Sequence, residues 1–137
     1  MFYYAKIIKQ DGDFLVSFPD LVNINTYGNT LEDALKNAAE ALNGSLEADF
    51  EYGYKLPEAR TRQGRGLYPV EVFPHIEIAY MLRQLRNGYS QKEIAGRLGI
   101  SQQAYQKLEN PRKCNPTMKT LEKISSVLNK KLEVTFV

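Results

Sequence analysis

Cysteine and histidine are nearly absent from this chain of 137 residues, which contains one of each, Cys114 and His75. A single cysteine excludes an internal disulfide, and a single histidine excludes histidine-centred metal sites and a structural zinc. Apolar runs are far shorter than the roughly 18 residues of a membrane-spanning helix, and the amino terminus has no signal-peptide pattern. We therefore expect a soluble cytoplasmic protein with no metal or other cofactor.

Basic residues are scarce in the first part of the chain and acidic residues are scarce in the last. Residues 1–56 carry four lysines against nine acidic residues, a net charge of −5. Residues 76–137 carry eleven lysines and arginines against five glutamates, a net charge of +6. This split predicts two domains with partners of opposite charge, and it makes the basic domain a candidate for nucleic-acid binding.

The first part of the chain has the pattern of several strands and one long helix. Alternating apolar and polar residues predict strands over 2–9, 14–18, 23–27 and 67–73. Thr30 is expected to cap a helix, with Asp33 at capping-box distance. Its predicted apolar face consists of Leu31, Leu35, Ala38, Ala39, Leu42 and Leu46. The order indicates an α+β fold that begins with an open β-β-β-α-β layer, whose segment 53–66 is a loop.

The second part of the chain contains two capped helices on a very short connection. Ser90 precedes Glu93 by three residues and forms a capping box, Gly99 ends that helix, and Ser101 caps the next. Such a unit is typical of a helix-turn-helix, whose second helix enters the major groove of DNA. The outward residues of that helix are Gln102, Gln103, Gln106 and Lys107, and Gln and Lys side chains can pair with adenine and guanine edges. The alternative is an ordinary helical bundle.

Further helices and a final strand complete the predicted second domain. Helical spacing begins at Ile76, and Asn115-Pro116 is expected to start the last helix. Ala104, Tyr105 and Leu108 are predicted to face the core, with the Tyr105 hydroxyl at the edge of the DNA interface. Residues 131–137 alternate as a strand, and a lone strand needs a partner. We expect that partner to be a second copy, which gives a homodimer or higher oligomer paired through Leu132, Val134 and Phe136.

Residues 78–128 resemble an XRE-type, lambda-repressor/Cro-like DNA-binding domain. The resemblance rests on the helix-turn-helix and on the run Leu108-Glu-Asn-Pro followed by Asn115-Pro-Thr-Met-Lys-Thr-Leu-Glu-Lys-Ile124. It implies that the helix beginning at Ser101 reads bases. It also implies that Gln91, Arg112, Lys113 and Asn115 meet phosphates.

The first part resembles the HicB antitoxin family. The similar segments, in order, are Phe18-Pro19-Asp20-Leu21, Tyr27-Gly28-Asn29-Thr30, the helix starting Leu31-Glu-Asp-Ala-Leu, and Pro57. The resemblance implies a partial RNase H-like toxin-binding domain over residues 1–74, followed by a DNA-binding and dimerisation domain over 75–137. It further implies a HicA-type toxin as partner, a small basic ribonuclease, and repression of the operon that encodes both.

Acidic side chains of the first domain are the candidates for contact with a basic toxin, since opposite charge favours docking. They are Asp11, Asp13, Asp20, Glu40, Glu47 and Asp49. The alternative is that these residues form an ordinary solvated surface. A second alternative for the whole chain is a transcription regulator that senses a ligand or another protein and has no toxin partner.

Enzymatic activity is not expected. A two-metal nuclease site requires converging carboxylates, and the available candidates are Asp11, Asp13, Asp20 and Asp33. These aspartates occupy a hairpin tip, a strand end and a helix cap, which are ordinary structural positions. Cys114 lies beside Lys113 and a helix start, a setting that can lower a thiol pKa. We interpret it instead as an ordinary loop thiol.

Overall fold

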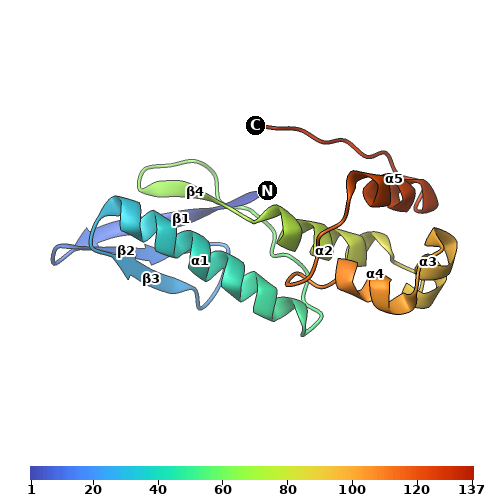
Figure 1. The fold of residues 1–137 in the computed structure, drawn as a ribbon. Coiled ribbons are helices and arrows are strands. Elements are labelled where there is room, and N and C mark those ends of the chain that lie inside the picture. Colours follow the sequence, from blue (N-terminus) through green and yellow to red (C-terminus); the bar gives the residue numbers. More distant parts are fainter. The chain divides into compact units, whose positions relative to one another are not determined.

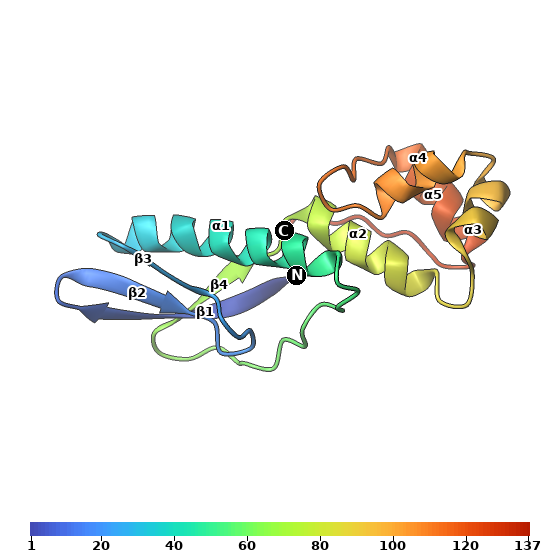
Figure 2. The same cartoon turned by 90° about the horizontal axis from the view of Figure 1, so that it is seen from below.

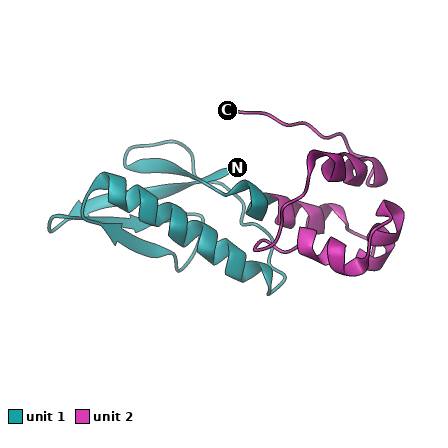
Figure 3. Cartoon of the chain, viewed as in Figure 1, with its two compact units in different colours: residues 1–77 teal, residues 78–137 magenta.

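Four antiparallel strands covered by one long helix form the first of the two units into which the chain folds. The computed structural model describes residues 1–137 and separates into residues 1–77 and 78–137 (Figures 1 and 3). The elements are β1 (Phe2–Gln10), β2 (Asp13–Ser17), β3 (Asn25–Gly28), α1 (Leu31–Phe50), β4 (Leu67–Glu71), α2 (Pro74–Leu85), α3 (Gln91–Leu98), α4 (Gln102–Leu108) and α5 (Met118–Val127). The predicted α+β class is confirmed. No helix is long and apolar enough to cross a membrane.

The sheet has the strand order β3-β2-β1-β4, and α1 covers one of its faces (Figure 2). Pairing is antiparallel throughout, with Ile7 opposite Val16 and Tyr3 opposite Val70. Because alternate residues of a strand face opposite sides, the buried Tyr3, Ala5 and Ile7 of β1 lie on one face together. This face and α1 enclose the core of the first unit.

Helix α1 begins as predicted but buries a slightly different row of residues. The Thr30 hydroxyl accepts a hydrogen bond from the Asp33 amide at 3.0 Å. The buried residues are Ala34, Ala38, Leu42, Asn43 and Leu46, whereas the predicted Leu31, Leu35 and Ala39 are only half-buried. Gly28, which has no side chain, lets the helix approach β3 closely, since a Cβ atom on Gly28 would lie 2.3 Å from the Ala34 backbone nitrogen. A side chain at position 28 is therefore excluded by the backbone of α1.

The second unit is helical, and it differs from prediction in three places. Helix α5 begins at Met118 rather than at Asn115-Pro116, because Thr117 is the residue whose hydroxyl caps the free amides. Ala104 is exposed, since α4 turns only the side of Tyr105 and Leu108 toward the core. Residues 131–137 form no strand in the single chain, because no other backbone of the chain pairs with them.

Candidate functional site

The helix-turn-helix of the second unit is built by two serine caps and one glycine. The Ser90 hydroxyl accepts from the Glu93 amide at 3.0 Å, and the Ser101 hydroxyl accepts from the Ala104 amide at 3.1 Å. Between them Gly99 adopts a φ of 71°, a left-handed conformation that glycine takes without steric cost. The turn between α3 and α4 is therefore as short as predicted.

Packing on one side of α4 leaves its other side to solvent. Ile94, Ala95 and Tyr105 are buried together, and Leu98, Val127 and Leu128 pack against them. The predicted base-reading residues lie on the opposite side and are all exposed: Gln102, Gln103, Gln106 and Lys107. The Ser101 hydroxyl accepts from the helix and can still donate to another group. This arrangement presents an amide-rich surface with one positive charge.

A buried carboxylate joins the end of α4 to the residues that follow α2. Glu109 is 3% exposed, and its two oxygens accept from the Arg86 side chain at 2.7 and 3.1 Å. The pKa of Arg86 is raised, mainly by these hydrogen bonds. Gln91, predicted to contact phosphate, donates one amide hydrogen to Glu109 at 3.3 Å and keeps a second. Arg86 and Glu109 are not among the predicted site residues, because nothing in the sequence pattern separates a buried glutamate from an exposed one.

Tyr105 faces the core as predicted, but its hydroxyl does not lie where it was expected. The side chain is fully buried at 0% exposed, and its hydroxyl has no hydrogen-bond partner. Burial, together with the neighbouring Glu109, raises the pKa of the phenol. The prediction that this hydroxyl reaches the edge of the DNA interface is therefore wrong. The residue belongs to the core, where it packs with Ile94 and Ala95.

The loop between α4 and α5 displays the remaining DNA candidates. The Asn110 side chain accepts from the Arg112 amide at 3.0 Å, and its carbonyl accepts from the amides of Lys113 and Cys114. The compact turn leaves the side chains of Arg112, Lys113 and Asn115 exposed. Cys114 lies in this loop, as interpreted, but its side chain is buried, and burial raises its pKa to about 11. The lowered thiol pKa considered from the sequence is therefore wrong.

The acidic candidates of the first unit do not form one patch. Asp11 and Asp13 lie at the hairpin tip, at the end of the unit where α1 begins (Figure 1). Glu40 and Glu47 are seven residues apart and share one side of α1, and Asp49 lies near its other end. A helix of 20 residues is about 30 Å long. The acidic charge is thus spread along the unit, and no group of three or more residues is arranged to hold a metal ion.

Asp20, predicted as a toxin contact, has a structural role in the first unit. One carboxylate oxygen accepts from the amides of Arg60 and Thr61 at 3.0 and 2.9 Å, and the other accepts from the Thr61 hydroxyl at 2.8 Å. These bonds, led by that from the Thr61 amide, hold the pKa of Asp20 below its ordinary value. Asp20 therefore fixes the connection between α1 and β4.

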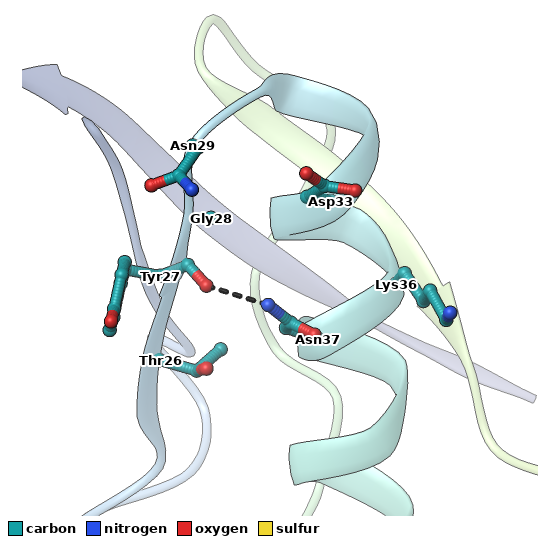
Figure 4. Close-up of a pocket in the computed structure, with 7 residues that line it drawn as sticks. All are labelled: Thr26, Tyr27, Gly28, Asn29, Asp33, Lys36 and Asn37. Atoms are coloured by element: carbon teal, nitrogen blue, oxygen red, sulfur yellow. Dashed lines mark hydrogen bonds between the residues drawn. The ribbon is translucent and has the colours of Figure 1, made fainter. Parts of the chain in front are cut away.

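A small polar pocket lies between β3 and the first turns of α1 (Figure 4). Its volume is about 350 Å³. Asn37 crosses the space between the two elements and donates to the Tyr27 carbonyl at 2.8 Å. The other lining residues are Thr26, Gly28, Asn29, Asp33 and Lys36. The lining is polar and includes one acidic and one basic side chain, those of Asp33 and Lys36.

Comparison with known proteins gives two family matches that follow each other along the chain. Residues 3–72 match the model of a HicB_like antitoxin of bacterial toxin-antitoxin systems, and residues 81–134 match a helix-turn-helix family. Among curated proteins, the chain is similar to Antitoxin HicB 1 of Photorhabdus laumondii subsp. laumondii. The two are 27% identical over 126 residues, which cover 92% of this chain and 80% of the relative.

Proposed function

The chain belongs to the HicB-like family of antitoxins, and from this premise we propose that it neutralises a HicA-type ribonuclease toxin and represses the operon that encodes the pair. The observation that carries the proposal is the order of the two matched segments, an antitoxin domain followed by a helix-turn-helix. The first unit would bind the toxin and the second would bind operator DNA. The proposal gives the protein no catalytic role and places it in the cytoplasm, beside its DNA and its toxin.

The exposed side of α4 supports the DNA-binding part of the proposal. Gln102, Gln103, Gln106 and Lys107 would read base edges in the major groove. Phosphate contacts would come from residues that precede or follow that helix in the chain: Gln91, Ser101, Arg112, Lys113 and Asn115. The second unit carries eleven lysines and arginines against four glutamates, and a net charge of +7 favours a polyanion.

The charge of the first unit supports the toxin-binding part. It carries seven lysines and arginines against twelve acidic residues, a net charge of −5, which favours a basic partner. The proposed contributors are Asp11, Asp13, Glu40, Glu47 and Asp49. Asp20 is the weakest of the predicted contacts, because its carboxylate already accepts three hydrogen bonds.

The carboxyl-terminal tail supports dimerisation. Val134 and Phe136 are 55% and 98% exposed, whereas Leu132, which shares their alternation in the sequence, is half-buried in the single chain. An extended segment with unpaired backbone and exposed apolar side chains is suited to pairing with the same segment of a second copy. Twofold pairing would set two α4 helices about 34 Å apart, as a palindromic operator requires.

The proposal expects a small basic protein to be encoded beside this gene, and co-expression of the present chain with that protein tests it. That protein alone should stop growth and cleave RNA, and the present chain should restore growth. A reporter behind the shared promoter should be silenced by the chain. The double variant Gln102→Ala/Gln103→Ala should still restore growth but fail to silence the reporter. Repression without rescue of growth would instead favour the alternative, a sensing regulator with no toxin partner.

A further inference from the structure

The sheet of the first unit has an apolar row on the face turned away from α1. Ile8 lies directly opposite Leu15, and Leu15 lies directly opposite Tyr27, so the three side chains cross three neighbouring strands. They are 50%, 42% and 58% exposed. Side chains paired in this way are about 5 Å apart, close enough to form a continuous surface. Phe2, 43% exposed, extends the same face along β1.

The β4 edge of the sheet is closed to an added strand. Gly66 and Val72 direct their backbone groups toward β1, so residues 67, 69, 71 and 73 direct theirs away from the sheet. At this edge Pro69 has no amide hydrogen. The buried side chain of Asn43 donates to the Glu71 carbonyl at 3.0 Å and accepts from the Phe73 amide at 2.7 Å. Asn43 thus occupies the positions that a pairing strand would use.

The β3 edge is closed by the same helix. Asn37, six residues before Asn43 on α1, donates to the Tyr27 carbonyl at 2.8 Å. The backbone of α1 also presses against Gly28 at the end of this strand. With both edges occupied and one face covered by α1, the exposed row on the other face is the part of the sheet left for a protein partner.

The charge around this row indicates which partner would cover it. On the hairpin side of the row, Asp13 pairs with Gln10 and Asp11 lies in the turn, whereas Lys6 is the one charged side chain on its other side in β1. The whole unit has a net charge of −5, so two copies stacked through this face would repel each other. A basic protein whose docking surface has an apolar centre would bind more favourably for two reasons. It would bury the apolar row, and its positive charge would be attracted to the negative charge of the unit.

We propose that the open sheet face centred on Ile8, Leu15 and Tyr27 is the docking surface for the basic toxin partner, a proposal that rests on the proposed function. The partner packs flat on this face and does not extend the sheet. Exposed apolar patches of this kind commonly mark protein interaction sites. The acidic residues at the hairpin tip border the contact, and the apolar row supplies its centre.

Binding of the basic protein encoded beside this gene, in a catalytically inactive form, to the full-length chain tests the surface. Leu15→Lys should weaken binding about 100-fold in calorimetry, the scale of a central interface residue. Val22→Lys is the matched control, because Val22 is 86% exposed in the same unit but lies outside the row. It should bind like the wild type. Tyr27→Ser tests the row without a new charge and should weaken binding by at least tenfold.

Hydroxyl-radical footprinting of the wild-type complex tests the same surface without a substitution. Tyr27 should become protected on binding, while Tyr52, 75% exposed in the same unit, should stay reactive. Unchanged affinity of Leu15→Lys and Tyr27→Ser, or an unprotected Tyr27, would overturn the docking surface alone. Loss of self-association in Leu15→Lys with unchanged toxin affinity would assign the face to a second copy and overturn it too. A wild-type chain that does not bind the toxin would refute the proposed function itself.

Discussion

Arg86 donates two hydrogen bonds to the Glu109 carboxylate, one from Nε to Oε2 at 2.7 Å and one from Nη2 to Oε1 at 3.1 Å. Arg86 follows α2, and Glu109 caps the carboxyl end of α4. The pair therefore fixes the end of the proposed recognition helix to another part of the second unit. Arg86 also donates to the Tyr89 carbonyl at 2.9 Å, which holds the segment leading into α3.

We expect Arg86→Ala to destabilise the second unit by about 3 to 5 kcal/mol. The substitution leaves the Glu109 carboxylate buried without its charged partner. A buried charge without a partner lowers the free energy of unfolding strongly. Urea denaturation of the full chain measures the loss. Arg97→Ala is the control, since exposed Arg97 stacks on Tyr89 and is worth only about 0.5 to 1 kcal/mol. Equal losses from the two variants would contradict a special role for the pair.

Asp20 should make the stability of the first unit sensitive to acid. Its pKa in the folded protein lies below the ordinary value, so the stabilisation is complete above about pH 4 and is lost as the pH falls through the lowered pKa. The melting temperature of the wild type should therefore exceed that of Asp20→Asn near neutral pH, and the difference should vanish in acid. Thr61→Val removes one donor to this carboxylate. The melting temperature of this variant should fall below that of the wild type by a smaller amount than that of Asp20→Asn, with the same pH dependence. A difference in melting temperature that does not shrink as the pH is lowered would contradict the prediction.

Substitutions on and beside α4 should separate base reading from phosphate binding. Gln102→Ala or Gln103→Ala should cost roughly 1 to 3 kcal/mol at the operator and little on random DNA. Arg112→Ala or Lys113→Ala should weaken binding to both DNAs and lower the salt slope by about one unit for each phosphate that is no longer neutralised. Fluorescence anisotropy at several salt concentrations measures all four variants. Equal losses on both DNAs from the glutamine variants would place α4 outside the groove.

Removal of residues 132–137 should convert the protein to a monomer. Without tail pairing the two helix-turn-helix units are no longer joined, and a palindromic operator would be bound weakly, while the toxin is still held. Sedimentation velocity and operator binding measure the two effects. The point variants Val134→Lys and Thr135→Lys are a matched pair, because they lie on opposite sides of the alternating tail. Val134→Lys should be the more damaging, and a truncated chain that stays dimeric would move the dimer interface to the helices.

The sequence by itself determined the elements and the class of the protein, because these depend on local signals. Caps at Thr30, Ser90 and Ser101 and the glycine at position 99 fix helix ends through hydrogen bonds within a few residues. The alternation of apolar and polar residues predicted four strands near their observed positions, because successive side chains of a strand face opposite sides of the sheet. The order of motifs was also sufficient to indicate an antitoxin with a helix-turn-helix.

Only the tertiary structure decided which polar residues are buried and what they bind. Asn43, Glu109 and Asp20 each bind groups 18 to 41 residues away in the sequence, and no local pattern specifies such a partner. The only local feature that distinguishes Asn43 in the sequence is that it is a polar residue next to the apolar row of α1. The continuous row of Ile8, Leu15 and Tyr27 likewise depends on the register between strands, and register exists only once the strands have paired.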